Sequence, residues 1–133
     1  MRPGCRRLAL AVVVAFLVFS LGCNHRVKQL APQTISLSYN NGNCTQNGGT
    51  AVVELDPTGS VTYQSATAVG QFQVQFTTCP FASCPITSSN GSPANAGQPK
   101  SGTAGNTYYY SSITIGNQPC NGLGAMGVRI RPQ

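Results

Sequence analysis

The chain has 133 residues, a formal net charge of +6 and only 8% charged side chains. That length is enough for one domain with a modest core. No cluster of basic residues is interleaved with aromatic ones, which disfavours nucleic-acid binding, and no nucleic-acid partner is predicted.

Residues 1–22 have the order of a lipoprotein-type signal peptide. A basic start precedes an apolar run over 8–21, interrupted only by Ser20. The run is shorter than the ~20 residues that span a bilayer, which disfavours a transmembrane anchor. Ser20-Leu21-Gly22-Cys23 resembles the bacterial lipobox, in which cleavage leaves a cysteine that is then acylated. We therefore predict lipidation of Cys23; the alternatives are an ordinary cleaved signal and an uncleaved anchor.

Cleavage before Cys23 leaves a tether over 23–32 and a domain over 33–133. The mature chain keeps five basic and two acidic side chains, a net charge of +3. Arg26 and Lys28 in the tether are able to contact anionic headgroups at ~1 kcal/mol each, but two charges do not make a polybasic segment, so a solvated tether is favoured. The expected location is the cell envelope, lipid-anchored to a bacterial membrane on its periplasmic or surface side.

Short segments of alternating apolar residues predict β-strands throughout the domain. The clearest is 71–76, where Phe72, Val74 and Phe76 share one face and glutamines the other. Such a strand needs a second layer over its aromatic face. The other predicted strands cover 34–39, 50–55, 61–64, 108–115 and 126–131. With turn signals between them and no helical period, they indicate an all-β sandwich. Residues 87–106 contain no large apolar residue, and a flexible surface loop is expected there.

Four cysteines remain in the domain, an even number that is typical of an oxidising compartment. Of the three pairings, we predict Cys79–Cys84, which closes a short loop, and Cys44–Cys120, which joins an early loop to a late one. A zinc site is the alternative, but it favours two close CxxC pairs. A redox-active dithiol also favours CxxC rather than four intervening residues.

The order of these segments resembles a family of cupredoxin-like exported bacterial domains. The residues that carry the resemblance are Val61-Thr62-Tyr63, Phe72 to Phe76, Pro80-Phe81, the tyrosine-rich strand Tyr108 to Ile115, and Cys120 followed by the strand ending at Ile130. The resemblance covers most of residues 33 to 131. It implies a Greek-key β-sandwich of about seven to eight strands, like that of the small blue-copper proteins.

The residues of a blue-copper site are incomplete. Such a site needs two imidazoles, a thiolate and usually a weak axial thioether. Cys120 and Met126 lie near the positions of a thiolate and a thioether, but the one histidine, His25, falls in the tether. We therefore predict no metal and no cofactor.

Acid–base catalysis also has little support. Glu54 and Asp56 are the only side-chain carboxylates, two apart on a predicted strand, so they share a face and are able to approach each other. At a strand end before a Pro-Gly turn, solvated carboxylates are favoured. We expect no enzymatic activity and no catalytic residues.

Three functions are compatible with these residues. The first is a membrane-anchored, non-catalytic binding or interaction module for a glycan or protein partner, with Tyr108 and Tyr110 forming an exposed aromatic pair opposite Tyr109. Burial of that face, with Tyr109 exposed instead, is the competing interpretation. The second is a passive structural envelope lipoprotein. The third is an electron-transfer cupredoxin, which the fold resemblance alone supports.

Overall fold

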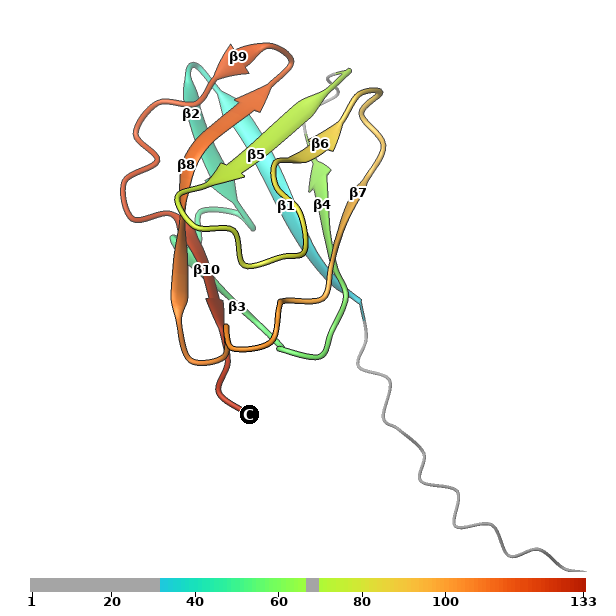
Figure 1. Cartoon of the computed structure of the whole chain (residues 1–133). Coiled ribbons are helices and arrows are strands. Elements are labelled where there is room, and N and C mark those ends of the chain that lie inside the picture. The colour runs from blue at the N-terminus through green and yellow to red at the C-terminus, as the bar shows by residue number, and fades with distance from the viewer. Residues whose placement is uncertain (1–31, 67–69) are drawn as a thin grey trace, which may run out of the picture.

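The computed structural model describes residues 32–66 and 70–133, which form an all-β sandwich of two sheets (Figure 1). The ten strands in these residues are β1 (Gln33–Asn40), β2 (Asn43–Gln46), β3 (Val52–Leu55), β4 (Val61–Ser65), β5 (Phe72–Phe76), β6 (Ile86–Ser88), β7 (Ala94–Gly97), β8 (Thr107–Ile115), β9 (Gln118–Pro119) and β10 (Gly127–Ile130).

The chain passes between the two sheets several times, and only β1–β2, β5–β6 and β8–β9 pair strands that are consecutive in the chain. The first has the order β2-β1-β4-β7, and the second has the order β3-β10-β8-β5-β6, with β9 paired to β8. The pairs β1–β4 and β3–β10 are parallel, and the other pairs are antiparallel. Parallel neighbours require crossover connections, and in the second sheet the β3–β10 pair brings an early and a late segment of the chain side by side.

The predicted alternation of β5 is confirmed and sets the inner face of the second sheet. Phe72, Val74 and Phe76 are buried, whereas Gln73 between them is exposed. The facing sheet contributes inward side chains with the same period, which lie in β1 and β4: Ile35, Leu37, Val61 and Tyr63 are fully buried. The second layer that the alternation requires is therefore the sheet β2-β1-β4-β7.

A cluster of four aromatic rings fills the centre of the core. Phe81 is fully buried and packs edge-on against Tyr63 at 6.4 Å and against Phe76 at 5.9 Å between ring centroids. Tyr110 lies 4.9 Å from Phe76. Phe81 belongs to the loop closed by the Cys79–Cys84 disulfide. That disulfide therefore constrains the loop that inserts an aromatic side chain between the sheets.

The expectation of a flexible loop over 87–106 is wrong. β6 extends into this segment and pairs with β5, and β7 pairs with β4 at the edge of the first sheet. Thr103 is buried, and the Lys100 backbone N–H donates to the Pro80 carbonyl at 2.8 Å. As an edge strand, β7 is held by backbone hydrogen bonds and needs only small side chains such as Ala94 and Ala96. Its sequence therefore lacks the large apolar residues from which a strand would be predicted. Short strands of this kind also raise the number above the predicted seven to eight.

Gly127 allows β10 to lie close against β8. It is buried, and a Cβ added there would overlap the carbonyl oxygen of Tyr108. We expect Gly127→Ala to lower the free energy of unfolding by about 3 kcal/mol, because the two backbones must separate to accept the methyl group. Urea unfolding checks this. Gly70→Ala is the matched control, since its Cβ has no described atom within 4 Å and should change stability by less than ~0.5 kcal/mol. Equal stability of the two variants would contradict the close approach.

Candidate functional site

The outer face of the second sheet carries the largest exposed aromatic side chain in the part of the chain described. Tyr109 is 45% exposed. Strand register places polar side chains beside one another on the same outer surface: Gln73 pairs with Thr87 and Thr114, and Gln75 pairs with Ser112. We call this surface the Tyr109 face; it consists of Tyr109, Gln73, Gln75, Thr87, Ser112 and Thr114. None of its side chains is charged, so it suits a neutral ligand.

The dimensions of the Tyr109 face follow from strand geometry. The Thr77 N–H donates to the Tyr109 carbonyl at 3.0 Å, so Tyr109 lies opposite the residue that follows β5. Gln73 is four residues earlier on that strand, a separation of about 14 Å at the usual rise per residue. The ring and the amide–hydroxyl row of Gln73, Thr87 and Thr114 therefore lie within reach of one extended ligand of a few units.

The predicted exposed pair of Tyr108 and Tyr110 is not present. Tyr110 is only 4% exposed, and Tyr108 is half-buried. The cause is a register shift between β5 and β8: Phe76 pairs with Tyr110, whereas Gln75 pairs with Ser112, which leaves an extra residue in β8. Such a bulge reverses which side chains point inward. Tyr110 therefore lies in the core together with Ile113 and Ile115, and Tyr109 is the exposed ring.

Tyr110 belongs to a buried chain of hydrogen bonds rather than to a surface. Its hydroxyl donates to Oε1 of Gln46 at 2.7 Å, so the hydroxyl of Tyr63, 3.2 Å away, must donate to Tyr110. Nε2 of Gln46 donates to the carbonyls of Ala51 and Gly127, both at 2.8 Å. Burial raises the pKa of Tyr63 and of Tyr110 above the ordinary phenol value. Both phenols are neutral, and the chain joins the two sheets.

Sequence reasoning missed Gln46. It is fully buried, although it lies in a segment rich in Asn and Gly that has the composition of an exposed turn. The available signal was its position two residues after Cys44 in a short strand, where side chains two apart share a face. Cys44 is itself buried through the disulfide.

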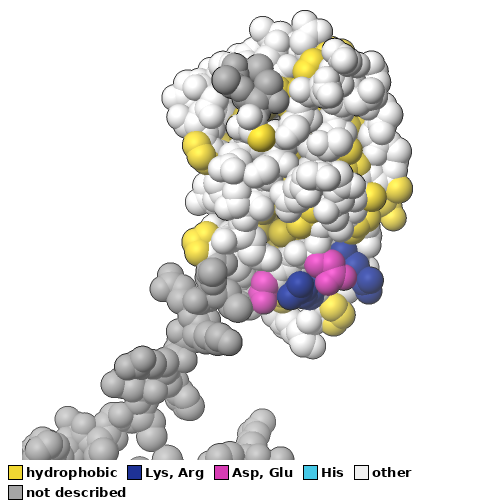
Figure 2. Space-filling view, turned by 180° about the vertical axis from the view of Figure 1, so that it is seen from behind, with side chains coloured by type: hydrophobic (Ala, Val, Ile, Leu, Met, Phe, Trp, Pro, Cys, Tyr) yellow, Lys and Arg dark blue, Asp and Glu magenta, His cyan; other side chains and the backbone are white. Residues whose placement is uncertain are grey.

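The charged side chains of the described residues gather at one end of the sandwich. Figure 2 shows acidic and basic side chains together there, next to the position where the chain enters the domain. Arg129 lies beside Glu54 in the β3–β10 pair, and Lys100 lines a surface cavity of about 310 Å³ together with Pro57 and Gln133. We call this region the charged end; its charged residues are Glu54, Asp56, Lys100, Arg129 and Arg131.

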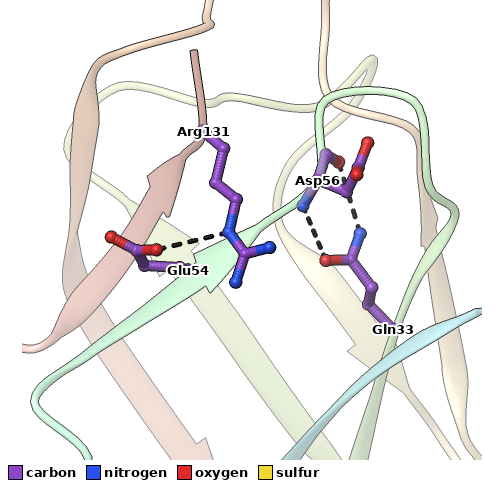
Figure 3. Close-up of polar contacts among 4 residues, drawn as sticks. All are labelled: Gln33, Glu54, Asp56 and Arg131. Atoms are coloured by element: carbon purple, nitrogen blue, oxygen red, sulfur yellow. Dashed lines mark hydrogen bonds and ion pairs between the residues drawn. The ribbon is translucent and has the colours of Figure 1, made fainter. Parts of the chain in front are cut away.

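The two carboxylates of the charged end have separate partners, and Figure 3 shows that of Glu54. Oε2 of Glu54 accepts from Nε of Arg131 at 3.2 Å, and this ion pair is exposed. Oδ1 of Asp56 accepts from the Thr58 N–H and from the Thr58 hydroxyl, both at 2.9 Å. The backbone hydrogen bond from Thr58, and then its hydroxyl, hold the pKa of Asp56 below the ordinary carboxyl value. Glu54 thus pairs with a residue that follows β10, whereas Asp56 holds the turn at Thr58.

Both predicted disulfides are confirmed. Cys44 and Cys120 are bonded with their Cα atoms 5.4 Å apart, and Cys79 and Cys84 with theirs 6.0 Å apart. Cys23 and His25 lie outside the described residues, as do the predicted signal over 1–22 and nearly all of the tether. Across residues 32–66 and 70–133, no group of three or more His, Cys, Asp or Glu side chains is arranged to hold a metal ion. No helix long and apolar enough to cross a bilayer occurs in those ranges either.

Comparison with known proteins assigns no family. No protein-family model matches the chain, and no curated protein has a similar sequence. The function must therefore be argued from the side chains described above.

Proposed function

We propose that this chain is an extracytoplasmic lipoprotein whose β-sandwich is a non-catalytic binding module. The observation that carries the binding proposal is the Tyr109 face, where an exposed ring adjoins a row of uncharged amides and hydroxyls. An aromatic ring supplies a large contact area with a polar tip, and neighbouring amides and hydroxyls supply directional hydrogen bonds. This combination suits a neutral glycan or an uncharged peptide segment.

Export and lipid anchoring are supported by independent features of the chain. The lipobox-like Ser20-Leu21-Gly22-Cys23 follows an apolar run with a basic start. The domain contains two disulfides, which persist in oxidising compartments. Mass spectrometry of the N-terminal peptide of the membrane-extracted protein tests anchoring. A diacylated or triacylated Cys23 is the expected result, and an unmodified chain that begins elsewhere contradicts it.

The finer fold proposal is a Greek-key sandwich of the cupredoxin-like type. Support comes from the strand orders β2-β1-β4-β7 and β3-β10-β8-β5-β6, with one parallel pair in each sheet. In this arrangement the loop carrying Cys120 connects β9 to β10. Cys120 is held in a disulfide with Cys44. Its sulfur therefore serves as a structural crosslink, in accordance with a binding module rather than an electron carrier.

Replacing Tyr109 tests the binding proposal. On glycan and peptide arrays probed with the purified protein, we expect Tyr109→Ala to weaken binding to the recognised ligand by about tenfold or more, because a central aromatic contact is lost. Thr45→Ala is the matched control, since Thr45 is exposed on β2 of the opposite sheet. Thermal unfolding verifies that both variants are folded. Absence of any array ligand, or equal binding by both variants, contradicts the assignment of this face.

A further inference from the structure

The charged side chains of the described domain lie at one end of the sandwich and not across one of its faces. All the charged side chains of the described residues belong to the charged end, and β9 lies at the opposite end of the sandwich (Figures 1 and 2). The N-terminal end of β1 and the C-terminal end of the chain lie at the charged end as well.

A pair of side-chain hydrogen bonds fixes where the chain enters the domain. Oε1 of Gln33 accepts from the Asp56 N–H at 2.6 Å, and Nε2 of Gln33 donates to the Asp56 carbonyl at 3.3 Å (Figure 3). The Gln33 N–H also donates to the Ser60 carbonyl at 2.9 Å. The first residue of β1 is thus held against the charged end by three hydrogen bonds. A membrane anchor that precedes Gln33 in the chain is therefore connected to the domain at the charged end.

The distance to the predicted anchor is short. Pro32 is nine residues after Cys23. Even fully extended, that segment reaches at most ~32 Å, and a flexible chain of this length averages only about 17 Å. With Cys23 acylated, the charged end is the part of the sandwich nearest the bilayer.

We propose that the charged end docks on anionic phospholipid headgroups and holds the Tyr109 face clear of the membrane. The proposal rests on the lipid anchoring of the proposed function, but not on any ligand of the Tyr109 face. Arg131 is occupied by Glu54, whereas Lys100 and Arg129 lie outside that ion pair and are exposed. Lys100 and Arg129 are the cations that the charged end offers to a membrane surface, beside the carboxylate of Asp56. Each cation near an anionic bilayer strengthens association about fivefold.

Site-specific photo-crosslinking in proteoliposomes tests the orientation. The full lipidated protein, extracted from membranes, is reconstituted in phosphatidylcholine vesicles with or without phosphatidylglycerol. A photoreactive amino acid replaces Ser101, next to Lys100, or Gln118 in β9 at the opposite end; both positions are exposed. We expect lipid crosslinks from position 101 only, more of them with phosphatidylglycerol, and their loss in high salt.

Neutralising the two cations supplies the second measurement. The double variant Lys100→Gln with Arg129→Gln should lower the crosslinking yield at position 101 on anionic vesicles by about tenfold or more, whereas Thr87→Ala on the Tyr109 face should not change it. Equal crosslinking from both ends, or a yield insensitive to salt and to the double variant, overturns the docking proposal while anchoring stands. Recovery of the chain only in the soluble fraction overturns anchoring, and the docking proposal with it.

Discussion

Replacing both Cys44 and Cys120 by serine will lower the free energy of unfolding by about 4.5 kcal/mol. The bond joins residues 76 apart in sequence, and the loop-closure entropy that it removes from the unfolded chain grows with the length of that loop. Its loss also weakens the junction between the β1–β2 turn and the β9–β10 loop, where the Asn121 N–H donates to the Gly42 carbonyl at 2.7 Å. For a domain of this size, such a loss is a large share of the total stability.

The second disulfide is the matched control. Cys79 and Cys84 are only 5 residues apart, and the same argument gives a loss of about 2 kcal/mol for their double serine variant. Urea unfolding of the two variants measures the difference in their free energies of unfolding. The difference is read from the midpoint urea concentrations, provided that the dependence of the free energy on urea has the same slope in both. A larger loss for the Cys79–Cys84 variant would show that positioning of Phe81 in the core outweighs the entropy of the unfolded chain.

Replacing Gln46 by alanine will lower the free energy of unfolding by about 4 kcal/mol. The amide is fully buried and has three partners, namely the carbonyls of Ala51 and Gly127 and the hydroxyl of Tyr110. Its removal leaves these groups in the interior without that partner, at ~1–3 kcal/mol for each group left unsatisfied, and creates a cavity. Water entering the cavity recovers part of this cost, which sets the estimate below the full sum.

The chain offers two comparisons for Gln46. Gln73→Ala removes the same side chain from an exposed position on β5 and should change stability by less than ~0.5 kcal/mol. Tyr110→Phe removes only the hydroxyl between Tyr63 and Gln46 and should cost about 1–2 kcal/mol. If Gln46→Ala proves no more harmful than Gln73→Ala, the hydrogen-bond chain does not hold the sheets together.

Strands with a buried and an exposed face were predictable because their pattern is local. The alternation of Phe72, Val74 and Phe76 against glutamines determines which side faces the core, whatever the partner strand is. The same holds for Ile35 and Leu37 in β1. The disulfide pairing was also predictable, since only three pairings exist and one of them closes a short loop at the end of β5.

The tyrosines of β8 were mispredicted because a bulge has no signature in a single strand. Alternation over Tyr108 to Ile115 places Tyr109 with Ile113 and Ile115, but the extra residue beside Gln75 moves Tyr110 to the inner face. The register shift arises because β8 pairs with β5 along one part of its length and with β10 along another. Likewise, β7 forms because the edge of β4 is open to pairing. The small side chains of β7 give no alternating apolar pattern from which a strand could be predicted.

By itself, the sequence determined the all-β class, the inner faces of its regular strands and the two disulfides of this protein. The fold class and the strand faces depend on residues that are close in the chain, and the disulfides depend on a choice among only three pairings. Only the tertiary structure decided which tyrosine is exposed, that Gln46 is buried, and that all the charges of the described domain lie at the end where the chain enters. These features depend on register and crossover between segments up to 81 residues apart, such as Gln46 and Gly127. No local pattern encodes such contacts, because their energy exists only once both sheets are in place.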